Sequence, residues 1–184
     1  MQGLGVDAVD LHSNDFELMG LPERFAIDRA QLDERWKALQ KQSHPDQFAR
    51  EGAAAQRLAM QWSVRINEAY QRLKDPLARA AYLCRLRGQD VEAERNTAMP
   101  AAFLMQQMAW REALEEAEAP EALERLAAEV QQTAAQTLTR VQAELDGADP
   151  LGAARAVHEV RALMFIERLR SEVDAKIDRL HEAG

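Results

Sequence analysis

The stretch that decides how the first half of this chain folds is His44-Pro45-Asp46, read together with the helices predicted on either side of it. Residues 28–43 are predicted to form a helix that starts at the capping residue Asp28. Pro45 has no backbone N–H to donate and disfavours helical angles at the residue before it, so this helix must end at the tripeptide. The sequence therefore predicts that His44 and Asp46 are displayed on a loop between two helices.

The helix before the loop is predicted to have an apolar face and a basic face. Leu32, Trp36 and Leu39 recur at helical spacing and are expected to face the core. Lys37 and Lys41 lie four residues apart on the other face, where two like charges cost roughly a few tenths of a kcal/mol. An ordinary solvated surface accounts for these lysines. A docking surface for an acidic partner, next to the loop, accounts for them better.

His44 and Asp46 also have the side chains of an acid–base pair, which suggests catalysis as an alternative. The sequence gives this alternative little support, because no motif fixes a Ser or Cys nucleophile and Pro45 keeps the two residues off a shared helical face. The four histidines of the chain show no metal-ligand spacing. Three of them are expected at the surface: His12, His158 and His181.

Helical patterns continue after the loop, and strand patterns are nearly absent. Residues 53–74 are predicted to be a long helix, and Asp75-Pro76 starts a shorter one that Gly88 closes. Residues 88–98 are polar with little periodicity and are predicted to be a linker. The apolar stripe of the long helix consists of Leu58, Trp62, Ile66, Ala69 and Leu73.

The second half is predicted to be three helices joined by short connections, which fold into an antiparallel bundle. Pro100 opens a helix that runs to about Glu118, and Pro120 opens the next one, which ends at the break formed by residues 147–150. A last long helix follows. The second helix has apolar residues at near-heptad spacing: Leu123, Leu126, Val130, Ala134, Leu138, Val141 and Leu145. The third carries the apolar residues Leu151, Val157, Ile166, Leu169, Val173, Ile177 and Leu180.

The charge of the chain, which has 184 residues and a net charge of −8, is unevenly distributed. Residues 1–95 hold 14 Lys and Arg against 15 Asp and Glu, whereas residues 96–184 hold 9 against 16. So acidic a chain is a poor candidate for nucleic-acid binding. The acidic half suits a positively charged partner, or serves solubility alone.

Targeting and redox signals in the sequence point to the cytoplasm. No apolar stretch approaches the length of a membrane span, and residues 1–11 lack the features of a signal or transit peptide. The single cysteine, Cys84, excludes an internal disulfide framework and a Cys-rich metal site. It is expected to be a small buried side chain in a reducing compartment.

The predicted helix over residues 101–118 has two apolar faces instead of one. At about 100° per residue, one side gathers Phe103, Trp110, Leu114 and Ala117, which are expected in the core. The opposite side carries a second apolar stripe bordered by acids: Leu104, Met105 and Met108, followed by Glu112, Glu115 and Glu116. Exposed apolar side chains bordered by charges are typical of a binding surface. On pattern alone, packing against another part of the chain explains the stripe equally well.

The loop and its flanks resemble a J-domain, the module that docks on DnaK-class chaperones. The resemblance covers residues 14–22 as the first helix, 28–43 as the second, 44–52 as the loop, and 66–82 as the end of the third helix running into the fourth. Ser43 stands where J-domains usually carry an aromatic residue, and Gln47 where they often carry a lysine. The resemblance implies that Lys37 and Lys41 meet an acidic patch of the chaperone, and that His44, Pro45 and Asp46 trigger its ATP hydrolysis.

The second half narrows the resemblance to the HscB family, the specialised J-proteins of iron–sulfur cluster assembly. The resemblance extends from Thr97 to Glu116, around the core Phe103-Leu104-Met105-Gln106-Gln107-Met108. Ala109 departs from it, because an acidic residue is expected there. The resemblance implies that the IscU-type scaffold protein binds to Leu104, Met105, Met108, Glu112, Glu116 and Phe165.

These observations predict an all-α, L-shaped protein with two domains. Residues 13–88 are expected to be the J-domain, 89–99 a linker, and 100–183 the antiparallel three-helix bundle. The predicted function is that of a co-chaperone, neither an enzyme nor a cofactor carrier, which stimulates a HscA/DnaK-class ATPase and delivers an IscU-type scaffold to it. Two alternatives stay open: a general J-protein with other clients, and a structural helical adaptor with a chance His-Pro-Asp.

Overall fold

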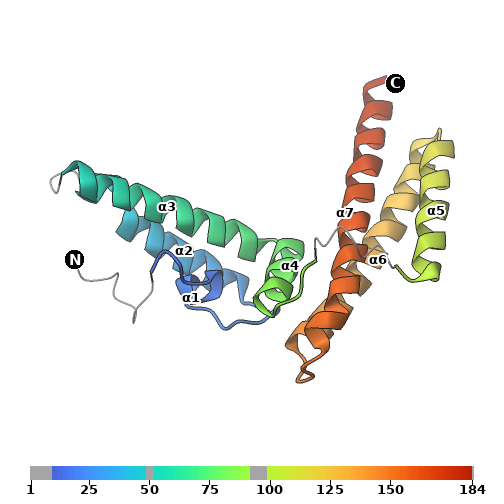
Figure 1. The fold of residues 1–184 in the computed structure, drawn as a ribbon. Helices are drawn as coiled ribbons and strands as arrows, with labels where there is room; N and C mark the ends of the chain where they lie inside the picture. Colours follow the sequence, from blue (N-terminus) through green and yellow to red (C-terminus); the bar gives the residue numbers. More distant parts are fainter. Residues whose placement is uncertain (1–9, 49–51, 92–98, 184) are drawn as a thin grey trace. The chain divides into compact units, whose positions relative to one another are not determined.

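The structure is a computed structural model that describes residues 10–48, 52–91 and 99–183, and all its regular elements in these ranges are helices (Figure 1). The chain divides into two compact units, Met1–Leu83 and Cys84–Gly184. Residues 1–9, where no targeting signal was expected, and residues 92–98 of the expected linker lie outside the described residues. In the described ranges, no helix has both the length and the apolar composition needed to cross a membrane.

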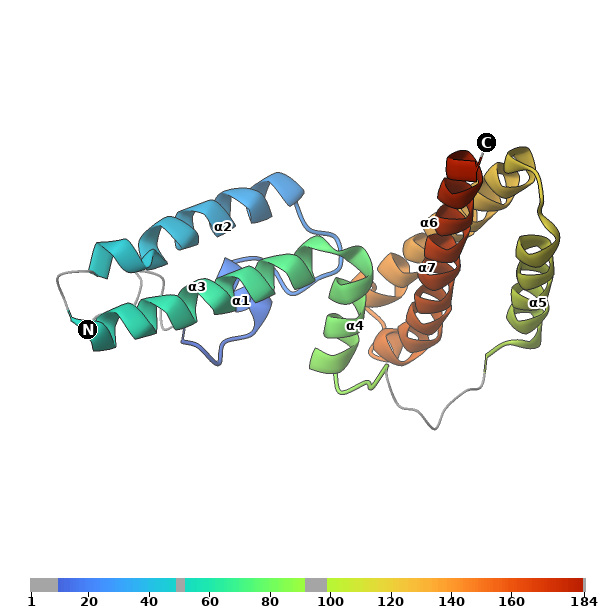
Figure 2. The same cartoon turned by 90° about the horizontal axis from the view of Figure 1, so that it is seen from above.

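The first unit is built on a helical hairpin. Its elements are α1 (Asp15–Met19), α2 (Arg29–Ser43), the 3-10 helix η1 (Pro45–Phe48), α3 (Ala53–Lys74) and the first part of α4 (Pro76–Leu86). Helices α2 and α3 run side by side in opposite directions, and α1 packs against both of them (Figures 1 and 2). The expected helices at 28–43 and 53–74 are confirmed within one residue.

Local sequence signals place the ends of these helices. Asp28 caps α2, since its carboxylate accepts hydrogen bonds from the N–H groups of Ala30 and Gln31 at 2.8 and 3.2 Å. Asp75 starts α4 in the same way, through the N–H of Ala78 at 2.7 Å. Gly88 closes the segment after α4 with a φ of 75°, a left-handed conformation that favours glycine.

Apolar side chains from all four helices fill the core of the first unit. Trp36 is half-buried and stacks on Tyr70, with 4.7 Å between the ring centroids and 21° between the ring planes. The most deeply buried side chains are Phe16, Met19, Leu32, Ile66, Leu73 and Leu83. The expectation that Leu32 and Leu39 face the core is confirmed.

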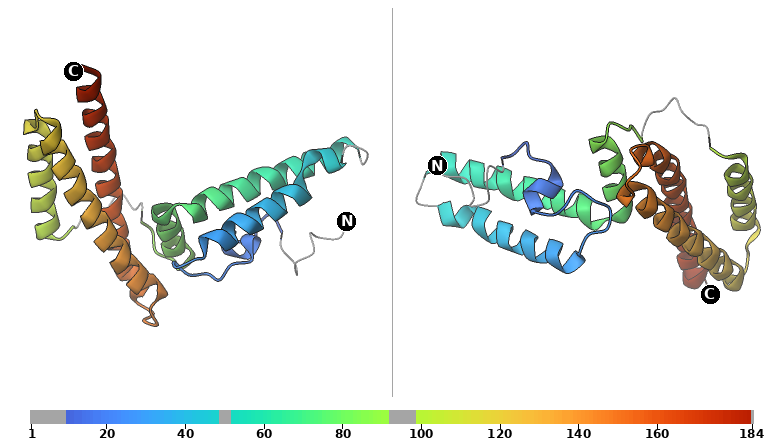
Figure 3. Two further views of the ribbon diagram at one scale, coloured as in Figure 1. Left: turned by 180° about the vertical axis from the view of Figure 1, so that it is seen from behind. Right: turned by 90° about the horizontal axis from the view of Figure 1, so that it is seen from below.

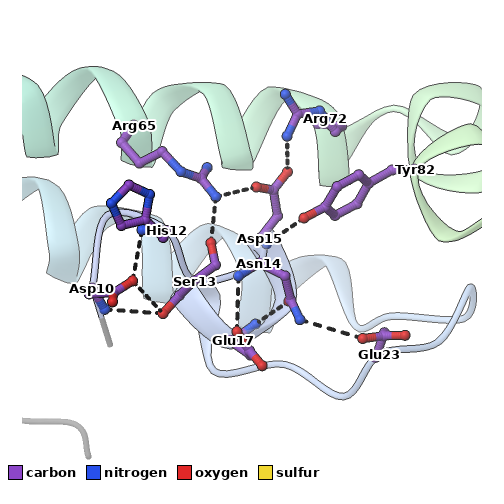
Figure 4. A network of polar contacts seen from close by, with 10 residues as sticks. All are labelled: Asp10, His12, Ser13, Asn14, Asp15, Glu17, Glu23, Arg65, Arg72 and Tyr82. Carbon is purple, nitrogen blue, oxygen red and sulfur yellow. Dashed lines mark hydrogen bonds and ion pairs between the residues drawn. The ribbon is translucent and has the colours of Figure 1, made fainter. Parts of the chain in front are cut away.

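Asp15 ties α1 to α3 through its buried carboxylate and to α4 through its backbone N–H (Figure 4). Asp15 is fully buried; its two oxygens lie 2.7 Å from Arg65 Nη2 and 2.5 Å from Arg72 Nη1. The N–H of Asp15 donates to the hydroxyl of Tyr82 at 2.9 Å. Arg65 also donates to the carbonyl of Ser13 at 2.8 Å. A charge in the interior needs such partners, because leaving it unpaired costs several kcal/mol by rough estimate.

The second unit is an antiparallel bundle of α5 (Ala101–Glu116), α6 (Pro120–Asp146) and α7 (Gly152–Ala183). Helices α6 and α7 form the main pair, and α5 lies beside α6 (Figure 3). The core of the bundle includes Trp110, Leu123, Leu145, Leu163, Ile166 and Leu169. The prediction of three helices with short connections is confirmed.

Most of the apolar positions at regular spacing in α6 and α7 are buried, but Leu138, Ile177 and Leu180 are half-buried and Leu151 is exposed. Leu151 lies before α7 and is 66% exposed. Leu138 is half-buried, and its neighbour Thr137 takes the buried position instead. A helix can bury this threonine because its hydroxyl donates to the carbonyl of Thr133 one turn back, at 2.8 Å.

The end of α4 and the residues after it belong to the second unit. Cys84 is buried, as expected, and burial raises the pKa of its thiol to about 11. Arg87 donates to the carbonyl of Leu145 at 2.6 Å, and Arg161 of α7 donates to the carbonyl of Val91 at 3.0 Å. The first residues of the expected linker are therefore held against the bundle.

Candidate functional site

The His44-Pro45-Asp46 loop follows directly from the end of α2. His44 is the C-cap of α2, with extended backbone angles (φ −64°, ψ 127°), and Pro45 starts η1. The side chains of His44 and Asp46 are 59% and 90% exposed, so neither contributes to the core. Exposed side chains held on a short, defined turn have the arrangement of a contact site.

The contact between His44 and Asp46 is not that of a catalytic pair. The imidazole Nδ1 accepts the backbone N–H of Asp46 at 3.3 Å, which leaves the ring proton on Nε2. The Asp46 carboxylate lies 3.6 Å from Nδ1, too far to orient the ring by a hydrogen bond. The geometry therefore favours recognition of a partner over acid–base catalysis.

The basic face of α2 lies next to this loop. Lys37 and Lys41 are exposed, whereas Leu32 and Leu39 on the other side are buried. Asp33, one turn before Lys37, has its own partners. The hydrogen bond from Arg29 at 2.8 Å, and a second from Tyr70 at 2.9 Å, lower the pKa of the Asp33 carboxyl.

Helix α5 presents two different faces. On one side Trp110, Leu114 and Ala117 are buried, and Phe103 is half-buried. On the other side Leu104, Met105 and Met108 are 44%, 71% and 72% exposed. The acids of the next turns, Glu112, Glu115 and Glu116, are exposed, and so is Ala109. The exposed apolar stripe therefore does not fill the interior of the bundle.

An aromatic cluster connects Phe165 of α7 to α5. Phe103 meets the rings of Trp110 and Phe165 edge-on, with centroid distances of 6.5 and 6.0 Å. The guanidinium of Arg111 lies 5.5 Å from the centroid of Phe165 and pairs with Glu172. Phe165, far from α5 in sequence, is thus held beside it by contacts that sequence patterns do not reveal.

Polar contacts from the other two helices hold α5 in place. Gln106 and Trp110 both donate to Oε1 of Glu129 on α6, at 3.0 and 2.8 Å. Lys176 of α7 donates to the carbonyl of Leu114 at 2.7 Å. Sequence analysis did not identify Glu129 and Lys176 as partners of α5, since nothing in their spacing shows which helices become neighbours.

Across the described residues, no three His, Cys, Asp or Glu side chains gather in a group that could hold a metal ion. The two candidate sites are a basic face with a displayed loop on the first unit, and an apolar stripe bordered by acids on the second.

Comparisons with known proteins agree with this description. Residues 99–174 match the family described as the HSCB C-terminal oligomerisation domain. The Co-chaperone protein HscB homolog of Burkholderia mallei (strain SAVP1) is 51% identical over 175 residues, which cover 94% of this chain and 98% of that protein. The homologue of Burkholderia vietnamiensis (strain G4 / LMG 22486) is 50% identical over the same length.

Two solved structures have the same fold. Chaperone HscB from Vibrio cholerae matches with a TM-score of 0.76 and 38% identity, over 91% of this chain and 99% of that one. Human co-chaperone protein HscB matches with a TM-score of 0.84 and 25% identity, over 92% of this chain and 84% of that one. The fold, together with the sequence and structural similarity to HscB proteins, defines a co-chaperone. The chain belongs to the HscB family, and this excludes a helical adaptor with a chance His-Pro-Asp.

Proposed function

We propose that this co-chaperone stimulates the ATPase of a HscA/DnaK-class chaperone and delivers an IscU-type iron–sulfur scaffold protein to it. The observation that carries the proposal is the apolar stripe of Leu104, Met105 and Met108, exposed on α5 opposite its own buried face. Exposed apolar side chains that do not fill the interior of the bundle are explained if a partner protein covers them.

In this proposal the first unit makes the chaperone contact. Lys37 and Lys41 attract an acidic surface of the ATPase domain, and charge attraction of this kind raises the association rate. His44, Pro45 and Asp46 then form short-range contacts, which their exposure leaves available. Hydrolysis itself takes place in the chaperone, so the co-chaperone needs no catalytic residue and no cofactor.

The second unit binds the scaffold in this proposal. Leu104, Met105, Met108 and Phe165 supply the apolar contact, and thioether side chains adapt well to a partner surface. Glu112 and Glu116 border the stripe and select a basic partner. We assign residues 13–88 to the J-domain, 89–99 to the linker and 100–183 to the scaffold-binding bundle. We place the protein in the cytoplasm, where a lone buried cysteine stays reduced.

The test is a quadruple variant with Leu104, Met105, Met108 and Phe165 all changed to alanine. Loss of an interface anchor costs roughly 2 kcal/mol or more of binding free energy. We therefore expect scaffold affinity, measured by calorimetric titration, to fall below detection. Stimulation of the chaperone ATPase without scaffold should remain, because the loop is untouched, and the extra stimulation that the scaffold adds should be lost.

A matched control removes exposed apolar side chains elsewhere: Met60→Ala together with Leu151→Ala, at positions 56% and 66% exposed. This control should bind the scaffold as the wild type does. Because Phe165 also packs on Phe103, early melting is tested on a triple variant that keeps Phe165, where it would show that the stripe supports the bundle. A folded variant that still binds the scaffold would favour a general J-protein with other clients.

A further inference from the structure

The end of α2 requires a hydrogen-bond donor that the following residues cannot fully supply. The last carbonyls of a helix have no partner inside the helix, and the N–H of the second residue beyond the helix often caps them. After Ser43 and the C-cap His44, that second residue is Pro45, which has no N–H to donate to the carbonyls of the last turn. The final carbonyl of α2, that of Ser43, accepts a hydrogen bond from another helix: the hydroxyl of Ser63 on α3 donates to it at 3.1 Å.

The two serine side chains form a pair at this point. Ser43 is buried and Ser63 half-buried, and their hydroxyl oxygens lie 3.3 Å apart. Because the Ser63 hydroxyl gives its only proton to the Ser43 carbonyl, the Ser43 hydroxyl is the donor between the two oxygens. Both polar side chains are thereby satisfied where α2 meets α3.

One turn further from the loop, a second set of bonds joins the same two helices. Gln40 donates to the carbonyl of Ser63 at 3.2 Å and to the side-chain oxygen of Asn67 at 2.7 Å. Trp36 donates to the same oxygen of Asn67 at 2.9 Å. The 3-10 helix η1, which includes Pro45 and Asp46, also packs against α3. The serine pair is thus the contact closest to His44 in a line of cross-helix hydrogen bonds.

We infer that Ser63 is a positioning residue for the His44-Pro45-Asp46 loop. Its hydroxyl fixes the last carbonyl of α2, and so fixes the direction in which the chain leaves the helix. A loop held in one direction before docking loses less conformational freedom on binding. Ser63 is half-buried between α2 and α3 and acts through the loop, without contact to the partner. The expected effect of Ser63 on ATPase stimulation rests on the proposed chaperone docking. The expected effect of Ser63 on the order of the loop does not.

The test compares Ser63→Ala, which removes the hydroxyl, with Ser63→Thr, which keeps it. Loss of one hydrogen bond should raise the concentration of co-chaperone needed for half-maximal ATPase stimulation about three- to tenfold. The maximal stimulated rate should stay the same, and Ser63→Thr should restore the wild-type concentration. Ser43→Ala keeps both the carbonyl and the Ser63 hydroxyl, and should stay within about twofold of wild type.

The matched control is Ser171→Ala, which removes a hydroxyl bound to the carbonyl of Glu167 at 3.1 Å within α7. It should leave stimulation unchanged. Wild-type behaviour of Ser63→Ala, or failure of Ser63→Thr to restore it, would overturn the inference. Alanine is a good helix former, so the variant is expected to keep α3.

A second readout separates this inference from the proposed function. Amide order parameters of His44 and Asp46, measured by NMR on the full chain, should fall in Ser63→Ala and return in Ser63→Thr. If the wild type failed to stimulate the ATPase, the proposed function would fail, and the order parameters would still decide the role of Ser63. Order parameters that do not differ between wild type and Ser63→Ala would refute the positioning role.

Discussion

At the scale of single residues, the loop combines exposed side chains with a fixed backbone. His44 and Asp46 contribute almost nothing to the core, whereas the carbonyl just before them is bound by Ser63. Substitutions at the two exposed positions should therefore change function without changing stability. Substitutions at buried core positions should instead lower stability.

We predict that His44→Gln and Asp46→Asn each abolish ATPase stimulation, because each removes an exposed ring or charge that is available to the partner. Surface substitutions of this kind change stability by roughly 0.5 kcal/mol or less. Steady-state ATP turnover and a thermal melt followed by circular dichroism measure both quantities on one sample. Stimulation at the wild-type level by either variant would argue against docking through the loop.

The sequence predicted the loop because Pro45 acts locally, through its own ring and its missing N–H. The Ser43–Ser63 bond was beyond sequence analysis. It joins positions that are 20 residues apart, and it exists only because α2 and α3 pack in one particular register. Contacts of this kind become visible once the two helices are placed side by side.

At the scale of helices, α5 has one face buried in the bundle and one face exposed. Its inner face carries Trp110 and Leu114, and its outer face Met105 and Met108. Both faces could be predicted, because 100° steps along one helix need no tertiary information. The burial of Thr137 in place of Leu138 in α6 could not, since the two side chains point about 100° apart and packing against the neighbouring helix decides which one is covered.

We predict that truncation separates the two faces of α5 in stability. Trp110→Ala removes a buried ring and its hydrogen bond to Glu129, and should lower the free energy of unfolding by about 3–5 kcal/mol. Met105→Ala, on the exposed side, should change it by less than about 0.5 kcal/mol. Denaturant titration of both variants measures the difference. Equal destabilisation would mean that α5 has no free face.

At the scale of the whole molecule, the helical content and the order of the elements followed from periodicity and breakers along the chain. Polar composition predicts a linker after Gly88, and the compact units divide between Leu83 and Cys84, inside α4. Burial of Cys84, and of Val91 beyond it, depends on α7, which begins some 60 residues later.

The uneven charge leads to a prediction for the whole chain. Residues 1–95 are nearly neutral but carry the basic face of α2, and residues 96–184 carry most of the acid. We expect association with chaperone and with scaffold to slow about tenfold or more between about 0.05 and 0.5 M salt, because ions screen both attractions. Stopped-flow association rates measure this.

A paired variant serves as the control for the salt experiment. Lys37→Ala together with Lys41→Ala should remove much of the salt dependence of chaperone association and leave that of scaffold association unchanged. Rates that do not respond to salt for either partner would mean that these charges only keep the protein in solution.

The buried carboxylate of Asp15 has a consequence for how this protein can evolve. Its charge is matched by Arg65 and Arg72 together, so replacement of either arginine leaves the buried carboxylate with one partner instead of two. A lineage that changes these positions one codon at a time passes through a less stable ancestor. We therefore expect the three positions to change together, and more slowly than the exposed surface around them.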